Sequence, residues 1–403
     1  MVKIHFFLAG CLLWCSVSEA FAQVAGVEHV VLIGVDAMSP DGLRNAETPR
    51  MDQLMNEGAF SLHARAVRPT SSSPNWASIF MGAAPEQHGI TSNGWERNNF
   101  SIAPVITGLE SIFPTIFSIL REQRPDAYIA CIYDWGGIGR LFEHSAVDLA
   151  FDAQDPQHAV NVARMVFAES RPTLTFIHLD HVDHAGHQFG WGSADYYAAV
   201  EEADGYIDQI VQGLEIAGMA DRTIIMIVSD HGGKGTGHGG DSMDEFIIPW
   251  IMHGPGVDKD INIPLPVYTY DTAATIATIL GLAQPYAWIG RPVLSAFESG
   301  VITAVEQTTA PKAVPVAFYL SQSYPNPFNP KTQFTLTVTQ SQHVRVAVYD
   351  VQGRRLAQLH DGLLSAHDEH VFTFEAPGLP TGIYLIRIDG ETFTATRSVV
   401  LLK

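Results

Sequence analysis

Aspartate, histidine and serine side chains that can bind metal ions recur in this chain at the ends of apolar runs. They are Asp36, Asp183, His187, Asp230, His231 and His238, together with the serines of PTSSSPNW (69–76). In open α/β sheets, ligands gather at the carboxyl ends of the strands, so distant segments can deliver these groups to one edge. Mixed carboxylate and imidazole ligands suit Zn²⁺, with Mn²⁺ or iron as alternatives. The pattern predicts a catalytic site with two metal ions.

Each of these residues also has an ordinary structural role open to it. Asp36 could cap the helix that follows its apolar run, although a carboxylate there is costly to desolvate without a partner. Asp230 and His231 place two adjacent ligand types after a second apolar run. Because several strand ends share this feature, we favour metal binding for them, whereas His253 is interpreted as structural.

The segment HLDHVDHAGHQFG (178–190) contains two ligand pairs with D-x-x-x-H spacing. Asp180 pairs with His184 in one reading, and Asp183 pairs with His187 in the other. The glycines of this segment predict a tight turn around the second pair, which we therefore prefer. The other histidines are interpreted as pocket walls or buried donors: His178 and His181.

The serine cluster runs directly into a helix predicted to begin near Pro74. A proline in the first helical turn leaves backbone N–H groups directed at the preceding residues, which favours an anion there. Alternatively, Ser73 caps the helix and the other serines belong to a loop. These local rules do not decide which hydroxyl is the nucleophile.

Apolar runs and amphipathic stretches alternate between residues 27 and 297. Strands are expected at 29–36, 127–133, 173–180, 222–230 and 246–252. Helices are expected at 48–58, 114–123, 157–170, 193–218 and 271–281, with N-terminal caps at Thr48 and Asp271. This pattern predicts an α/β fold with a mostly parallel sheet flanked by helices.

The pattern changes after residue 297. Residues 298–317 are expected to be a linker, and 318–403 alternate polar and apolar residues in short runs between turn sequences. This alternation predicts a small all-β sandwich without catalytic residues. The expected domains are therefore a signal peptide at 1–22, a catalytic domain at 23–297, the linker and the sandwich.

Composition limits the possible partners. The 403 residues are 46% hydrophobic and 16% charged, with a net charge of −20, so the chain is globular and repels nucleic-acid polymers. A small anion could still bind where metal ions neutralise its pocket.

The first 22 residues have the features of a secretory signal peptide, with Lys3, an apolar run and an Ala20–Phe21–Ala22 cleavage site. A lipoprotein signal ending at Cys11 is the alternative. Cleavage after Ala22 leaves Cys131 as the only cysteine. No other apolar run is long enough to cross a bilayer, so we expect an exported protein without a transmembrane segment.

Several short motifs occur together and in order. They read P-T-S-S-S-P-N (69–75), P-E-Q-H-G-I-T-S-N (85–93), D-H-A-G-H (183–187), S-D-H-G (229–232) and H-G before G-P-G (254–256). With them, residues 29–297 resemble the type I phosphodiesterase/nucleotide pyrophosphatase branch of the alkaline phosphatase superfamily. The resemblance implies an alkaline-phosphatase-like fold and a small phosphate-ester substrate.

The resemblance also implies roles for individual residues. Ser72 would be the nucleophile that forms a phosphoseryl intermediate, and Asn93 would hold the phosphoryl oxygens. One zinc ion would bind Asp183, His187 and His238, and the other Asp36, Asp230, His231 and Ser72. The chain departs from the pattern at Ser73, where several relatives have an aromatic residue that stacks on nucleobases, and at Trp76, where they have His. His238 follows His231 by only seven positions, where larger relatives have a long insertion.

Three functions are compatible with these observations. The first is a secreted phosphodiesterase or nucleotide pyrophosphatase, the second a phosphomonoesterase, and the third a non-catalytic cell-surface protein. A sulfatase is excluded because the chain has no C/S-x-P-S-R sequence.

The C-terminal region has a resemblance of its own. SYPNPFNPKT, VRVAVYDVQGRRL, LPTGIYLIRI and the final SVVLLK are similar to the sorting domains of the type IX secretion system. This implies the type IX machinery as a partner, and release from the cell or display at its surface after passage through the periplasm. A carbohydrate-binding or spacer sandwich is the alternative.

Overall fold

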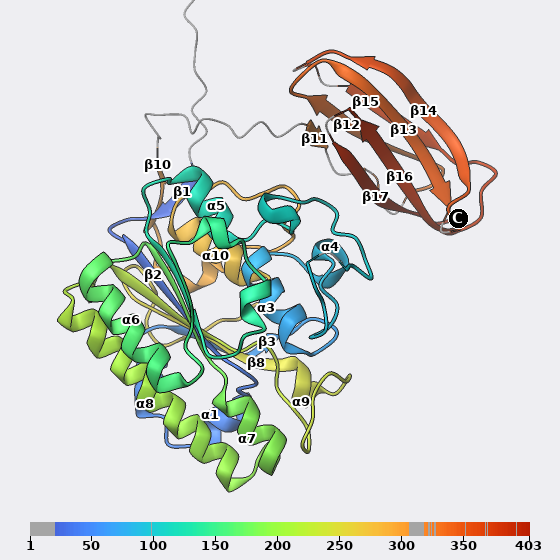
Figure 1. Cartoon of the computed structure of the whole chain (residues 1–403). Coiled ribbons are helices and arrows are strands. Elements are labelled where there is room, and N and C mark those ends of the chain that lie inside the picture. Colours follow the sequence, from blue (N-terminus) through green and yellow to red (C-terminus); the bar gives the residue numbers. More distant parts are fainter. Residues whose placement is uncertain are drawn as a thin grey trace, which may run out of the picture.

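The computed structural model describes residues 21–305, apart from position 98, and most of 318–403, apart from positions 321, 322, 324, 326, 327, 351, 367, 369 and 392. Figure 1 shows an α/β part and an all-β part. The first two residues of the described range belong to the predicted signal peptide, and the rest of that prediction lies outside it. Within the described range, no helix is both long and apolar enough to cross a membrane.

The α/β part is built on one sheet of eight strands, in the order β5-β4-β6-β2-β7-β8-β3-β9. Its strands are β2 (His29–Val35), β3 (Ala59–Arg65), β4 (Ile129–Tyr133), β5 (Leu149–Asp152), β6 (Leu174–Leu179), β7 (Thr223–Val228), β8 (Ile247–His253) and β9 (Ile261–Asn262). The strands β5, β4, β6, β2 and β7 are parallel to one another, and β8 is antiparallel to both of its neighbours. The predicted mostly parallel sheet is therefore confirmed.

Helices cover both faces of this sheet (Figure 1). They are α1 (Pro40–Asn45), α2 (Pro49–Asn56), α3 (Ser72–Met81), α4 (Pro85–His88), α5 (Ile116–Gln123), α6 (Pro156–Ser170), α7 (His181–Phe189), α8 (Ala194–Ile216), α9 (Met243–Phe246) and α10 (Asp271–Ile279). Alternate residues of β2 enter different cores. Leu32 packs with Phe80 of α3, whereas Ile33 packs with Ile207 of α8. Burial on both faces explains why the strand sequences are continuously apolar.

The structure differs from the sequence prediction at several elements. Residues 181–189 form helix α7 rather than a tight turn, and Gly190 follows its last residue with a φ of 92°. Helix α10 has Tyr270 as its N-cap, so Asp271 is its first residue instead. Strands β3 and β5 lie in segments for which no strand was expected; their burial alternates, so they lack a continuous apolar run.

A short strand pair lies outside the large sheet. Strand β1 (Phe21–Val24) pairs antiparallel with β10 (Ile302–Val305). Strand β10 lies inside the segment predicted to be a linker. The first part of that segment is therefore paired with the α/β part. The predicted domain boundaries remain predictions.

The all-β part consists of two antiparallel sheets that enclose a separate apolar core. One sheet contains β11 (Phe318–Leu320), β12 (Lys331–Val338) and β15 (His370–Glu375). The other contains β14 (Arg355–Leu364), β13 (Gln342–Asp350), β16 (Gly382–Gly390) and β17 (Thr394–Leu401). The small β domain is confirmed. Strand β14 has one buried residue, Leu364, and lacks a clear apolar alternation.

Candidate functional site

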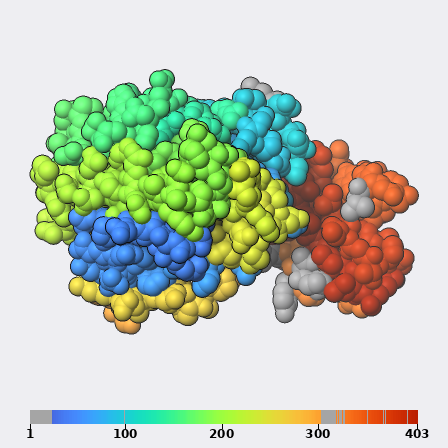
Figure 2. Space-filling view, turned by 90° about the horizontal axis from the view of Figure 1, so that it is seen from below, coloured from blue at the N-terminus to red at the C-terminus, as the bar shows by residue number. Residues whose placement is uncertain are grey.

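The predicted ligands come together because the strands that precede them are neighbours. Strand β2 lies between β6 and β7. Asp36 follows β2, Asp230 and His231 follow β7, and α7, which follows β6, carries Asp183 and His187. Figure 2 shows the segments after these strands meeting on one face, with α1 and α2 in blue beside α8 in yellow-green and the segment around α9 in yellow.

Asp36, Asp230 and His231 form a buried group at this edge. Each side chain is at most 1% exposed. The His231 Nε2 atom lies 3.2 Å from Asp230 Oδ2 and 3.6 Å from Asp36 Oδ1. Asp230 is held in place through its other oxygen, which accepts a hydrogen bond from the backbone N–H of Ala37. One ligand atom from each residue lies within 4.8 Å of the others, which is close enough for one cation.

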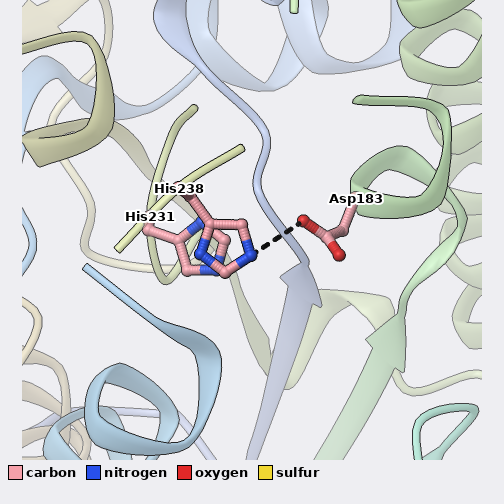
Figure 3. Close-up of side chains that lie close together, drawn as sticks. All are labelled: Asp183, His231 and His238. Atoms are coloured by element: carbon pink, nitrogen blue, oxygen red, sulfur yellow. Dashed lines mark ion pairs between the residues drawn. The ribbon is translucent and has the colours of Figure 1, made fainter. Parts of the chain in front are cut away.

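Asp183, His187 and His238 form a second group beside the first. The Nε2 atom of His187 lies 3.4 Å from Asp183 Oδ2 and 3.1 Å from His238 Nε2. His238 Nε2 is 3.7 Å from Asp183 Oδ1, the contact drawn in Figure 3. The ring of His231 stacks on that of His238 at 3.9 Å. One ligand atom from each of Asp183, His231 and His238 also lies within 4.8 Å of the others, so His231 is close to both groups, which the family resemblance assigned to separate ions.

The three histidine rings of these groups are oriented by the same kind of contact. The Nδ1 atom of each ring faces a backbone carbonyl: Thr236 O for His187, Gly232 O for His231 and Thr70 O for His238. A neutral ring that donates from Nδ1 has a lone pair on Nε2. Two such lone pairs face each other at 3.1 Å between His187 and His238. That arrangement is favourable with a cation between them, either a metal ion or a proton held by one of the two rings.

The acidic members of the site show the same need for a cation. Within the described part of the chain, Asp36 Oδ1, Asp183 Oδ1 and Asp230 Oδ2 are buried oxygen atoms that have no hydrogen-bond partner. Unpartnered buried polar atoms of this kind are rare in proteins. All three belong to predicted metal ligands and face ring nitrogens of the other ligands. The donor set therefore fits metal ions.

Ionisation of these carboxyl groups is unfavourable for the polypeptide alone. Burial, and then repulsion from Asp36, raises the pKa of Asp183 to about 9 and the pKa of Asp230 well above its usual range. Burial also opposes ionisation of Asp36, but the hydrogen bond from His178 and the charge of His231 outweigh it and lower the pKa of Asp36 to about 2. Burial lowers the pKa of His231 to about 4.

Ser72 is the first residue of α3 and its side chain lies beside the first group. The residue is 5% exposed, and its Oγ atom is 3.3 Å from His231 Nε2. Asn75 fixes the preceding turn, because its Oδ1 accepts from Val67 N and its Nδ2 donates to Pro69 O and Ser71 O. The P-N dipeptide of the motif therefore positions the serine.

Asn93 reaches the same helix terminus from another loop. Its Oδ1 atom accepts a hydrogen bond of 2.8 Å from the backbone N–H of Ser73. This leaves the N–H₂ group of the same amide free to donate. His88 anchors this loop to α3, since its Nδ1 accepts from Ile90 N and its Nε2 contacts Ser78 Oγ.

Only one member of the alternative ligand pair lies near these contacts: Asp180 has a ligand atom within 4.8 Å of those of Asp36 and His178. His184 contacts Asp180 Oδ2 at 3.1 Å, but its side chain is 74% exposed. His253 is 3.7 Å from Glu57 and is not among the site residues. Trp76 and His178 contact Asp36 from behind, and Asp134 contacts His178. Sequence analysis interpreted His178 as a pocket wall or buried donor and gave Trp76 and Asp134 no role in the site. Asp134 follows β4 directly, and this position at a strand end was the signal that could have identified it.

Comparison with known proteins shows the family to which this chain is similar. The profile of "Type I phosphodiesterase / nucleotide pyrophosphatase" matches residues 30–108 and 120–254, just over half of the chain. A second profile, "Secretion system C-terminal sorting domain", matches residues 322–402.

Curated relatives match over part of their length. Rat ectonucleotide pyrophosphatase/phosphodiesterase family member 3 is 26% identical over 227 residues, which are 50% of this chain and 24% of the relative. Human bis(5'-adenosyl)-triphosphatase ENPP4 is 25% identical over 221 residues, 50% of this chain and 47% of the relative. The chain thus spans less than half the length of these relatives.

Solved structures share the fold at low sequence identity. Mouse ectonucleotide pyrophosphatase/phosphodiesterase 5 has a TM-score of 0.54 at 15% identity, covering 64% of this chain and 96% of that one. Alkaline phosphatase PafA has a TM-score of 0.57 at 11% identity, covering 68% and 99%. The chain therefore belongs to the type I phosphodiesterase/nucleotide pyrophosphatase family of phosphoric ester hydrolases, and its C-terminal sorting domain indicates export to the cell surface or beyond.

Proposed function

We propose that the protein is an exported, metal-dependent hydrolase of small phosphodiesters that uses Ser72 as its nucleophile. The observation that carries the proposal is the set of unpartnered carboxylate oxygens and opposed imidazole lone pairs beside the Ser72 hydroxyl. We assign Asp183, His187 and His238 to one ion, and Asp36, Asp230, His231 and Ser72 to the other. Zn²⁺ suits these ligands best, with Mn²⁺ or iron as alternatives.

Two bound ions would supply the positive charge that makes the Ser72 hydroxyl acidic and neutralises the phosphoryl oxygens. Ser72 Oγ gives its proton to solvent and forms a bond to phosphorus, while the bond to the leaving alkoxide breaks. The alkoxide takes a proton from solvent. Water then attacks the phosphoseryl group, which releases the phosphate product and restores the hydroxyl. Asn93 donates its amide N–H to a phosphoryl oxygen during both displacements.

The residue after the nucleophile bears on the substrate. Ser73 is 1% exposed, and its Oγ has no hydrogen-bond partner among the residues that the structure describes. A serine offers no ring on which a nucleobase could stack, so this position favours no particular nucleoside. A phosphomonoesterase that uses the same residues is the second candidate, since it needs no platform for a second ester group.

Rates on a panel of aryl phosphate diesters and monoesters, measured with the purified zinc-loaded protein, test this function. We expect the kcat/KM for the diesters to exceed that for the monoesters. The reverse order would identify a phosphomonoesterase. A protein that binds two ions but hydrolyses neither class would contradict catalysis and indicate a binding role at the cell surface.

The ligand assignment predicts different metal contents for two neighbouring histidines of α7. His187→Ala should lower the bound metal by one ion per chain, because its Nε2 faces Asp183 and His238. His184→Ala is the matched control and should retain both ions, since this side chain faces solvent beside Asp180. Elemental analysis of the dialysed proteins measures the difference. Loss of metal from the His184 variant alone would move the site to Asp180 and His184.

Asn93→Ala should lower kcat on the order of 10² to 10³-fold, the usual cost of losing one donor to a developing oxyanion. The reason is its free amide N–H₂ group, held beside the terminus of α3 by the Ser73 N–H. Steady-state kinetics on folded, metal-loaded protein measures the effect. A kcat within a few-fold of the wild-type value, or a loss of thermal stability alone, would remove Asn93 from the catalytic site.

A further inference from the structure

We propose that Asp134 is a positioning residue that acts through His178 to make Asp36 a one-oxygen ligand. In this arrangement Asp36 binds its metal ion through Oδ1 only, and Oδ2 is reserved for hydrogen bonds within the protein. The inference rests on the proposed function, because it assumes that a metal ion binds beside Asp36. It adds residues to the site that the motifs of the family do not mark in this sequence.

The two oxygens of Asp36 have different surroundings. Oδ2 lies 2.9 Å from Trp76 Nε1, which donates to it, and 3.0 Å from His178 Nε2. Oδ1 is buried without a hydrogen-bond partner from the described residues, and it lies 3.6 Å from His231 Nε2. Since Oδ2 already faces two donors, a cation between Asp36 and His231 would approach Oδ1.

His178 is a support for Asp36 rather than a ligand. The side chain is fully buried, and its other ring nitrogen, Nδ1, lies 2.9 Å from Asp134 Oδ1. Both ring nitrogens therefore face carboxylates. His178, Asp36 and Asp180 lie close enough to hold a cation, but the ring has no nitrogen left to offer one. A carboxylate that orients a histidine in this way is typical of the outer sphere of metal sites.

Asp134 is itself held rigidly. Its side chain is 3% exposed, and its Oδ2 atom accepts a hydrogen bond of 3.1 Å from the backbone N–H of Asp180. Asp134 follows β4, and Asp180 follows the adjacent strand β6. The sheet thus fixes one oxygen of Asp134, and the other oxygen fixes the ring of His178.

Packing fixes the second donor to Asp36. The Trp76 ring lies over β2 at Gly34, where an added Cβ atom would be 2.4 Å from the ring. Its indole also meets the His178 ring edge-on at 5.0 Å. The Trp76 N–H is therefore directed at Asp36 by the shape of the core. The tryptophan that departs from the family pattern has a specific role here.

Asp134→Asn tests the proposal by metal binding rather than by activity. We expect the affinity for one of the two Zn²⁺ ions to fall about 10- to 100-fold, the usual effect of losing an outer-sphere partner, with the other ion unchanged. Competition with a chelator at graded free Zn²⁺ measures both affinities. Asp152→Asn is the matched control, because Asp152 ends the neighbouring strand β5 but is exposed.

Substitutions of His178 separate positioning from folding. His178→Gln can still place a donor beside Asp36 Oδ2, whereas the shorter side chain of His178→Asn cannot. We therefore expect the Gln variant to bind Zn²⁺ more tightly than the Asn variant, with equal melting temperatures in chelator. A purely structural role would instead lower the melting temperature in chelator and weaken both ions together.

Two results would overturn the inference, and they are distinguishable. Wild-type protein that binds no metal would refute the proposed function and this inference with it. Wild-type protein with two ions, and an Asp134→Asn variant with the same two affinities, would refute only the role of Asp134.

Discussion

Ser72→Ala should abolish turnover while the protein keeps both metal ions. Removal of a serine nucleophile lowers kcat on the order of 10⁶-fold in a well-studied hydrolase, and we expect a loss of that size. Metal content should be preserved because Asp36, Asp230 and His231 remain as ligands around the buried position of the Ser72 Oγ atom. Elemental analysis and kinetics on one preparation separate these two effects.

The neighbouring hydroxyl groups provide the controls for this result. Ser71 is the N-cap of α3 but makes no side-chain capping hydrogen bond, so Ser71→Ala should retain activity. Thr70 binds the loop that carries His238, since its Oγ1 donates to Gly240 O and accepts from Gly239 N. Thr70→Ala should therefore change metal binding as well as rate. Full activity in Ser72→Ala, with loss in Ser71→Ala at normal metal content, would show that another serine is the nucleophile.

Sequence reasoning predicted that these side chains would come together because strand ends are easy to recognise. The runs before Asp36, Asp180 and Asp230 are mostly apolar, and such runs become central, continuously buried strands of a parallel sheet. Since β6, β2 and β7 are adjacent, residues after those runs must be neighbours. The convergence follows from the chain order and the apolar pattern, without any knowledge of side-chain positions.

The support behind Asp36 could not be predicted in the same way. His178 lies inside an apolar strand, and only its position relative to Asp134 on the next strand gives it a role. Trp76 looks like an ordinary core residue of α3 until its N–H is found beside Asp36. These contacts depend on the orientation of single side chains across three strands, and spacing along the sequence carries no information about that.

Local conformation was also ambiguous in the ligand-rich segment. The spacing of Asp183 and His187 suits both a turn with a glycine and a helix, where residues four apart share a face. The structure forms helix α7, with Gly186 inside it. An added Cβ atom at Gly186 would lie 2.6 Å from Trp191, so this glycine is required by close packing rather than by a turn.

Deletion of residues 318–403 should leave an active enzyme that stops in the periplasm. The predicted ligands all lie at or before His238, and the all-β part has its own apolar core. A chain that ends at 317 keeps β10, whose pairing with β1 would be lost by a cut at 297. We expect kcat/KM within about two-fold of the full-length value, because the deleted part contributes no ligand. Cell fractionation and activity of the purified 23–317 protein test the two halves of the prediction.

The predictions of activity and of location can fail independently, because activity depends on the catalytic part and location depends on the export machinery. The ring of Phe318 contacts Tyr286 at 5.8 Å between ring centroids, so a variant with Phe318→Ala in the full chain is the control for loss of that contact. If the 23–317 protein is inactive while the Phe318→Ala protein is active, the catalytic part depends on the β domain through contacts other than the one between Phe318 and Tyr286. Transport depends instead on recognition of 318–403 by the export machinery. Fusion of 318–403 to an unrelated periplasmic protein should carry that protein out of the cell. If the 23–317 protein, which lacks 318–403, is still released from the cell, sorting depends on another segment.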